Sequence, residues 1–397
     1  MSGPRIALVH ERFTEYGGSE AVVAELLKLW TDAEVFAPIA TTECLEAVRA
    51  AARSTVQDHP AAQPRRSDVP DFLAPERFSF HTTWLSDAHT MLRGRSHAPL
   101  LPLVPRTLRH LPLRDRFDAV VVSHHAFATQ AVFATEAPVI AYVHSPARWA
   151  WDPGFRAQEA GGLAGRLALT ALGRLARRRE LSAAPRLTHV VANSRAVAAR
   201  VHDWWGLPAT VVSPPVRIDR FSPEPAFDRE DFFLCAGRLV PYKRPDLAIR
   251  AAQQAGCRLI ILGQGRFRPY LESIAGPETT FLGAAPDAVL LDMYRRCRAL
   301  LMPGVEDFGI VPVEAMACGT PVLAVGAGGA LDTVLPGRTG ELLPPAEDPE
   351  LVTEFATAMR EFDPHGYDSA IIREYAESFS PSAFRARMAE TVAAALS

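Results

Sequence analysis

Short apolar runs alternate with longer amphipathic stretches along the chain, and this pattern predicts repeated units of one parallel strand and one helix. Residues 5–10 ("RIALVH") predict a buried strand, and residues 19–30 ("SEAVVAELLKLW") a helix with Ser19 as its N-cap. Further strands are expected at residues 33–38, 117–125, 137–144 and 187–194, the last leading into a helix at 194–205. The stretch from about 60 to 116 is richer in proline and arginine and gives no clear pattern.

The same alternation restarts after a proline-rich segment, residues 209–230, which is the best candidate for a linker. Strands are expected at residues 231–239, 257–265, 279–284, 298–304 and 320–329. Helices are expected at residues 244–256, 286–297 and 312–319, and a final amphipathic helix at 380–397. The pattern predicts an α/β fold with a parallel sheet covered by helices on both faces.

Size and composition agree with two domains of this kind. The chain has 397 residues, which is more than one core usually supports, and 48% of them are hydrophobic. No signal peptide pattern or membrane-length apolar run is present, so a cytoplasmic protein is expected. The five cysteines are scattered and never in C-x-x-C spacing, which fits buried thiols better than a disulfide framework or a zinc site.

The charge is small overall, at −3, but arginines gather between residues 160 and 200, where Glu180 is the single acid. Such a segment suits a solvated helix face whose arginine stems cover apolar surface. Peripheral contact with an anionic membrane is the competing interpretation.

Two glutamates, Glu306 and Glu314, flank an apolar run in "EDFGIVPVEAMACG". Pro312 is expected at the first position of a helix that ends before Gly319, which would place Glu314 in the first turn and Glu306 in the loop before it. Free N–H groups at a helix start favour an anion, and carboxylates can accept hydrogen bonds from the hydroxyls of a diol. A sugar phosphate or nucleotide sugar offers both, although the two acids could also be an ordinary helix-dipole carboxylate and a surface residue.

Cations follow the strand at residues 231–239, in "AGRLVPYKRPDLAI". Arg238, Lys243 and Arg244 would lie at the strand's carboxyl end, where two or three of them could bind a diphosphate. The alternative is that these three basic side chains are simply solvated and bind no ligand. A diphosphate clamp formed by these cations is favoured, because the same sheet also supplies Glu306 and Glu314.

Other candidates are weaker. Gly17 and Gly18 precede a helix and could cradle a phosphate, and Gly263 and Gly265 ("GQG") could let a ring or phosphate approach the backbone or simply form a turn. No Walker motif or full dinucleotide fingerprint occurs, so NAD binding and ATP hydrolysis lose most of their support. His144 ends an apolar strand and is favoured as a functional residue, whereas a structural role is favoured for His124 and His125.

The segments "EYGGSE", "YVHSPARWAWD", "SPPVRIDRF", "AGRLVPYKRPDLAI" and "FLGAAPDAVLLDMYRRCRALLMPGVEDFGIVPVEAMACGTPVLAVGAGGALDTV" together resemble the retaining glycosyltransferases of family 4. The most specific part is E-x7-E at Glu306 and Glu314, with G-R-L-x-x-x-K upstream. The resemblance implies the GT-B fold. Its two Rossmann-like domains would be residues 1–215 on the acceptor side and 216–378 on the nucleotide-sugar side, with residues 379–397 packing back on the first domain.

The resemblance also implies roles for individual residues. Arg238 and Lys243 would neutralise the donor diphosphate, Glu314 would bind the ribose hydroxyls, and Glu306 would lie at the donor sugar. His144 would contact the transferred sugar near its reacting side. Further donor contacts are implied for Gly17, Gly18, Gly263, Gly265, Phe308, Gly309, Ile310 and Val311.

By this likeness the protein would move a hexose from a nucleotide sugar to a glycan, lipid-linked saccharide or glycoside, as in polysaccharide biosynthesis. GDP-mannose is the favoured donor and a UDP-sugar the alternative. No cofactor or metal is expected, since no D-x-D triplet occurs and the cations can stabilise the leaving group. Retention by front-face attack is preferred over a covalent intermediate. A nucleotide-sugar-binding scaffold without turnover is the competing class, and a GT-B epimerase or phosphorylase is less favoured.

Two positions depart from the common pattern of the family. Many relatives have glycine where this chain has Arg244, and many have glutamate where it has Asp332. Neither change removes a central group, but both bear on donor selectivity.

Overall fold

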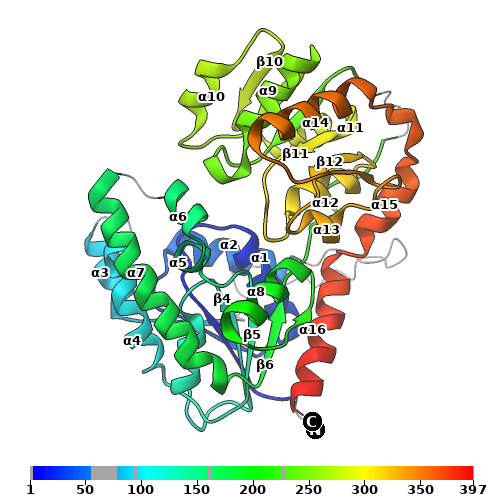
Figure 1. Cartoon of the computed structure of the whole chain (residues 1–397). Helices are drawn as coiled ribbons and strands as arrows, with labels where there is room; N and C mark the ends of the chain where they lie inside the picture. The colour runs from blue at the N-terminus through cyan, green and yellow to red at the C-terminus, as the bar shows by residue number, and fades with distance from the viewer. Residues whose placement is uncertain (1–2, 55–77, 93–96, 160–161, 225–228, 397) are drawn as a thin grey trace. The chain divides into compact units, whose positions relative to one another are not determined.

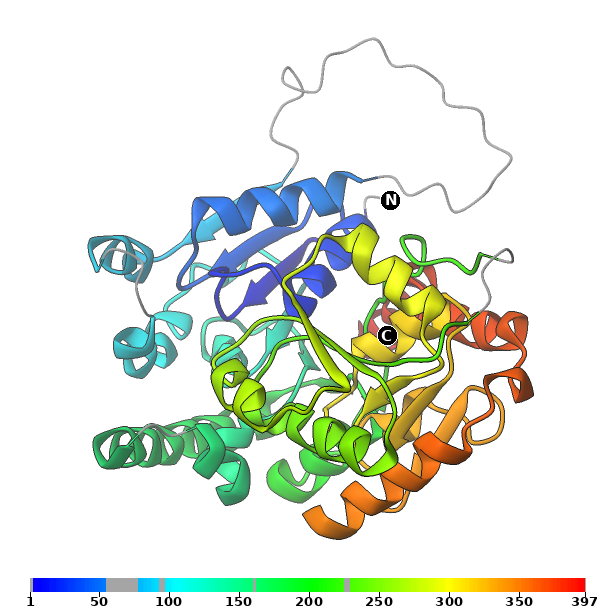
Figure 2. The same cartoon turned by 90° about the horizontal axis from the view of Figure 1, so that it is seen from above.

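The computed structural model describes residues 3–54, 78–92, 97–159, 162–224 and 229–396. The chain forms two compact units, drawn in Figure 1 and seen from above in Figure 2. Unit 1 comprises residues 1–193, 197–215 and 381–397. Unit 2 comprises residues 194–196 and 216–380.

Unit 1 is built on a parallel sheet of seven strands in the order β3-β2-β1-β4-β5-β6-β7. The strands are β1 (Ile6–His10), β2 (Glu34–Ala37), β3 (Ser79–Thr82), β4 (Ala119–His124), β5 (Val139–Val143), β6 (His189–Ala192) and β7 (Thr210–Val211). Alternate residues of β1 enter separate cores, Ala7 and Val9 on one face and Ile6 and Leu8 on the other. The strand order reverses between β1 and β4, which is where ligands bind in sheets of this type.

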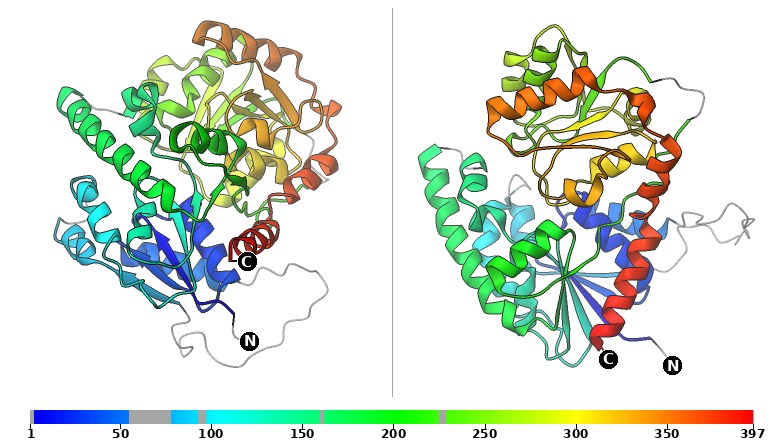
Figure 3. Two further views of the ribbon diagram at one scale, coloured as in Figure 1. Left: turned by 60° about the horizontal axis from the view of Figure 1, so that its bottom comes forward. Right: turned by 45° about the vertical axis from the view of Figure 1, so that its right-hand side comes forward.

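The helices of unit 1 supply the two covering layers. They are α1 (Gly18–Leu29), α2 (Thr42–Arg53), α3 (Trp84–Met91), α4 (Val104–Leu108), α5 (Arg148–Trp151), α6 (Pro153–Glu159), α7 (Gly162–Ala183), α8 (Arg195–Trp205) and α16 (Pro381–Leu396). The last helix, drawn in red in Figure 3, packs on α1. Phe384, Met388 and Val392 recur at a spacing of four residues and join the core beneath it, because that spacing keeps side chains on one helix face.

Unit 2 contains a six-stranded parallel sheet in the order β10-β9-β8-β11-β12-β13. Its strands are β8 (Phe233–Ala236), β9 (Leu259–Leu262), β10 (Thr279–Gly283), β11 (Leu300–Met302), β12 (Val322–Val325) and β13 (Gly340–Leu343). Its helices are α9 (Pro245–Ala255), α10 (Arg268–Ile274), α11 (Asp287–Arg296), α12 (Ile310–Ala317), α13 (Ala330–Thr333), α14 (Asp348–Glu361) and α15 (Ser369–Glu377). The order reverses between β8 and β11.

Every strand expected from the apolar runs is present, and both units are α/β as predicted. The N-cap of α1 is Gly17, so the prediction of Ser19 was wrong. Glu20 is the third helical residue, and its carboxylate accepts a hydrogen bond from the Gly17 N–H at 3.0 Å. Ser19 instead donates its hydroxyl to the same carboxylate. Within the described ranges, no helix has both the length and the apolar composition that a bilayer crossing requires.

Candidate active site

The loop after β8, residues 237–244, carries the predicted cations and is called the clamp loop here. Gly237 has a φ of +126°, a conformation open to glycine but strained for other residues, and lets the chain turn as it leaves the strand. Leu239 is buried and anchors the loop in the core. Arg238 and Lys243 both line a pocket at this edge of the sheet.

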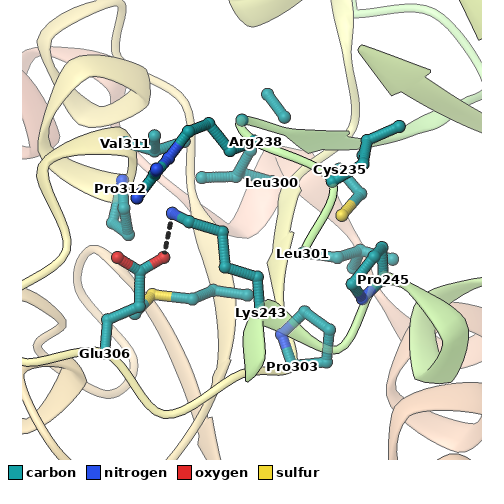
Figure 4. A pocket seen from close by; sticks show the side chains of 14 residues that line it. Cys235, Arg238, Lys243, Pro245, Leu300, Leu301, Pro303, Glu306, Val311 and Pro312 are labelled. Carbon is teal, nitrogen blue, oxygen red and sulfur yellow. Dashed lines mark hydrogen bonds and ion pairs between the residues drawn. The ribbon is translucent and has the colours of Figure 1, made fainter. Parts of the chain in front are cut away.

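The loop after β11, residues 303–309, carries Glu306 and is called the glutamate loop. A Cβ at Gly304 would lie 2.6 Å from the Lys243 carbonyl carbon, so the two loops meet backbone to backbone. Lys243 Nζ donates to Glu306 Oε1 at 2.6 Å, as Figure 4 shows, and both side chains are largely buried. Burial alone would lower the pKa of Lys243, but the charge and hydrogen bond of Glu306 hold that pKa above its ordinary value. The strand order thus brings together residues 63 positions apart in the sequence.

Helix α12 starts at Ile310, two residues earlier than expected, with Gly309 as N-cap at a φ of +91°. Pro312 is therefore the third helical residue, which is tolerated because the first N–H groups of a helix have no intrahelical acceptor. Glu314 is the fifth residue, so its predicted place in the first turn was wrong. The other end is as predicted: Gly319 follows the cap with a φ of +73°, and the N–H groups of Gly319 and Thr320 bond back to the last turn.

Glu314 is bonded by a residue that the sequence did not single out. Tyr294, fully buried on α11, donates its hydroxyl to Glu314 Oε2 at 3.2 Å. Burial raises the pKa of Glu314 to about 7, against the opposing effects of the Tyr294 hydrogen bond and nearby arginines. The carboxyl therefore changes its charge near neutral pH.

This pKa predicts a pH dependence of nucleotide binding. The family resemblance implies that Glu314 binds the ribose diol, and only the ionised carboxylate is a pure acceptor. On that role, affinity for a nucleoside diphosphate should rise about tenfold between pH 6 and 8 as Glu314 deprotonates. Calorimetry at both pH values measures it. Glu314→Gln is the control for the ligand's own phosphate titration, and an equal rise in that variant would contradict the prediction.

The two glycines of "GQG", Gly263 and Gly265, pack against the backbone of the clamp loop. A Cβ at Gly263 would lie 1.8 Å from the carbonyl oxygen of Gly237, and one at Gly265 would lie 2.1 Å from that of Leu239. The Leu239 N–H also bonds to the Gln264 carbonyl at 2.8 Å. In the same way, Gly329 packs against the backbone of Phe308 and donates its N–H to the Glu306 carbonyl at 2.9 Å. These glycines let backbone approach backbone and so fix both loops.

Arg244 lies in the clamp loop but does not line the pocket. Its φ of +55° and ψ of +40° are left-handed, and its guanidinium bonds to Asp246 and Asp348. The backbone at this position suits glycine, which explains why glycine would be accommodated there, and the two aspartates compensate for the strain. Of the two or three cations expected to bind a diphosphate, Arg238 and Lys243 line the pocket and Arg244 does not.

The remaining predicted residues lie in different places. Val311 lines the pocket with the two cations and Glu306. Four other predicted residues do not line it: Phe308 and Gly309 precede α12, and Ile310 and Glu314 lie within it. Gly17 and Gly18 form the exposed start of α1 in unit 1. His144 follows β5 in unit 1, where Ser123 bonds to its Nε2 at 2.8 Å.

The two neighbouring histidines differ from each other. His124 is fully buried and bonds to Glu180 at 3.1 Å, which agrees with the structural role predicted for it. His125 is half-buried and stacks on His144 with ring centroids 4.5 Å apart. Glu180, the lone acid of the basic segment, thus serves as a buried anchor for α7.

Parts of this chain match a known family and several known proteins. Residues 217–365 match the family described as glycosyl transferases group 1. A D-inositol 3-phosphate glycosyltransferase from Thermobispora bispora is 31% identical over 239 residues, 52% of this chain and 56% of the relative. A GDP-mannose-dependent alpha-mannosyltransferase from Mycobacterium tuberculosis is 36% identical over 154 residues, 37% of this chain and 39% of the relative. The matched parts thus span 56% of the first relative and 39% of the second.

Solved structures resemble the whole chain. Anabaena Alr3699/HepE in complex with UDP-glucose has a TM-score of 0.64 at 18% identity, covering 98% of this chain and 99% of that one. Sucrose-phosphate synthase from Thermosynechococcus elongatus has a TM-score of 0.66 at 17% identity and covers 98% of each chain. The chain therefore has the two-unit GT-B fold of these proteins, and its residues 217–365 match the glycosyl transferases group 1 model.

Proposed function

We propose that this protein is a glycosyltransferase that moves a hexose from a nucleotide sugar to a carbohydrate, lipid-linked saccharide or glycoside acceptor. The carrying observation is the pocket at the reversal of strand order in unit 2, where Arg238, Lys243 and Glu306 meet. Two cations can bind a diphosphate, and the adjacent carboxylate can accept hydrogen bonds from sugar hydroxyls. The group 1 match covers this pocket.

The mechanism that we propose retains the anomeric configuration and needs no metal. As the bond to the diphosphate breaks, negative charge grows on the leaving group, where Arg238, Lys243 and the N–H groups at the start of α12 can stabilise it. Front-face attack assisted by the departing phosphate is the preferred route. A glycosyl-enzyme trapped on any carboxylate would contradict it.

For the donor we propose GDP-mannose, because two relatives named for GDP-mannose are 36% identical over 154 residues and 35% identical over 161 residues. A UDP-sugar is the alternative, supported by the UDP complexes among the solved structures. Thermal shift with a panel of nucleotide sugars tests both, and transfer to an acceptor panel tests turnover. Binding of a donor without any hydrolysis or transfer would favour the scaffold class instead.

Peripheral membrane contact is a second proposal, placed on α7 of unit 1. Leu167 and Leu181 are 66% and 47% exposed on a helix that also carries Arg166, Arg174, Arg177 and Arg178. Exposed apolar side chains beside arginines suit an anionic lipid surface. Flotation with anionic vesicles should enrich the protein over neutral vesicles, and equal recovery would reduce the arginines to a solvated face.

A further inference from the structure

Four polar side chains in unit 1 form a continuous line of hydrogen bonds. Glu20 Oε1 lies 3.2 Å from His10 Nε2, His10 Nδ1 lies 3.0 Å from Ser123 Oγ, and Ser123 Oγ lies 2.8 Å from His144 Nε2. Glu20, His10 and Ser123 are all buried. We call these four residues the relay. It joins the carboxyl ends of β1, β4 and β5, including the point where the strand order reverses and where such sheets bind ligands.

The direction of the hydrogen bonds follows from Glu20. Burial alone would raise the pKa of Glu20, but hydrogen bonds from His10 and Ser19 hold that pKa below its ordinary value. An ionised carboxylate only accepts, so His10 donates from Nε2, and a His10 ring that carries this single N–H accepts at Nδ1. Ser123 then donates its single O–H to His10, and its oxygen accepts from His144 Nε2. His144 is thereby left with Nδ1 as an acceptor.

The His144 ring is fixed in place from several sides. Its backbone N–H donates to the His124 carbonyl at 3.0 Å, and its carbonyl accepts from Asn193 Nδ2 at 2.8 Å. The ring stacks on His125 with an interplanar angle of 11°. Burial lowers the pKa of His144 to about 3, so the ring is neutral at physiological pH. Its chemistry therefore depends on which nitrogen carries the hydrogen.

We propose that Glu20, His10 and Ser123 are positioning residues that hold His144 in the Nε2–H form and present its Nδ1 as a hydrogen-bond acceptor to a carbohydrate hydroxyl. The hydrogen bond to a carbohydrate rests on the proposed function, whereas the position of the hydrogen on the His144 ring does not. Across the described residues, no hydrogen bond to His144 Nδ1 is made by the protein itself. The other titratable groups around the ring are His124, His125, Tyr142 and, further away, Glu11 and Arg12.

Replacing Glu20 with glutamine should reverse the direction of every hydrogen bond in the relay. Glu20 Oε2 accepts from the Gly17 N–H and the Ser19 hydroxyl, so a glutamine would keep its oxygen there and turn its amide NH₂ toward His10. His10 would then accept at Nε2 and donate from Nδ1 to Ser123. Ser123 would in turn donate to His144 Nε2, which would convert His144 to the Nδ1–H form.

Nuclear magnetic resonance of protein with ¹⁵N-labelled histidine rings measures this directly, with His144 assigned through a His144→Gln variant. At pH 7.5 the wild type should show Nε2–H at both His10 and His144, and Glu20→Gln should show Nδ1–H at both. An Nδ1–H form at His144 in the wild type, or an unchanged His144 in a folded Glu20→Gln variant, would overturn the proposal. The wild-type spectrum alone decides it if the variant does not fold.

Two further variants separate the relay from a general loss of buried charge. Glu25→Gln removes another buried carboxylate from α1, one that pairs with Lys28 and Arg385, and should leave His144 unchanged. Ser123→Ala breaks the relay, so adding Glu20→Gln to it should have no further effect on His144.

Activity provides the second readout. Glu20→Gln and Ser123→Ala should lower kcat on the order of 10²-fold with little change in donor KM, because an acceptor toward the substrate is lost. An unchanged kcat beside an altered His144 would overturn the substrate role. Absence of transfer by the wild type with every donor would count against the proposed function, while the spectra still decide the relay.

Discussion

Lys243→Ala is expected to weaken nucleoside diphosphate binding about 100-fold, measured by calorimetry at pH 7.5. A charge-assisted hydrogen bond contributes roughly 1.5–3 kcal/mol, and its loss accounts for about a tenfold to hundredfold weakening. The variant also leaves Glu306 without the partner that lies 2.6 Å away. That uncompensated carboxylate would face the incoming diphosphate and repel it.

The pairing of Lys243 with Glu306 allows a sharper version of this experiment. If part of the loss is repulsion by Glu306, adding Glu306→Gln to Lys243→Ala should recover part of the affinity, and the two substitutions will not be additive. Glu306→Gln alone should lower turnover more than affinity, because its carboxylate is assigned to the sugar rather than the diphosphate. Lys28→Ala, which breaks a lysine–glutamate pair in unit 1, is the matched control. Binding by Lys243→Ala within twofold of the wild type would refute the clamp.

The sequence predicted the strands well because buried parallel strands read as short apolar runs. It missed β3, whose residues are partly exposed, β7, which has two residues, and β13, whose two central residues are only half-buried. Arg238, Lys243 and Glu306 were found from their positions after strands, since strand ends meet at one edge of a parallel sheet. The direct Lys243–Glu306 contact depends on β8 pairing with β11, which local sequence does not specify.

Side-chain chemistry alone could not separate Arg244 from Lys243, because both are cations in one loop. The left-handed backbone at Arg244 and the aspartates that bind it decide the difference. The relay was missed for a related reason: Glu20, His10 and Ser123 come from α1, β1 and β4, and no spacing links them. The available signal for the relay was Glu20 shortly after two glycines, together with His10 and His144 at the ends of two strands.

Gly263→Ala is expected to have the second large effect, on both stability and nucleotide binding. In the wild type Gly263 contacts the clamp loop through its backbone alone. The added Cβ would lie 1.8 Å from the carbonyl oxygen of Gly237, and the φ of +145° would be strained for alanine. Overpacking and strain together should lower the free energy of unfolding by roughly 3 kcal/mol, measured by urea denaturation. The backbone that carries Arg238 must move to relieve the clash, so nucleoside diphosphate binding should weaken as well.

Gly256→Ala separates these two causes. Gly256 has a φ of +66° at the end of α9, and a Cβ there would meet nothing within 4 Å. That variant carries backbone strain without a clash, so it should lose about 1 kcal/mol and bind the nucleotide normally. If Gly263→Ala behaved like Gly256→Ala in both measurements, the clamp loop would not depend on its contact with "GQG". A loss of binding specific to Gly263→Ala would instead make that glycine part of the site through the backbone alone.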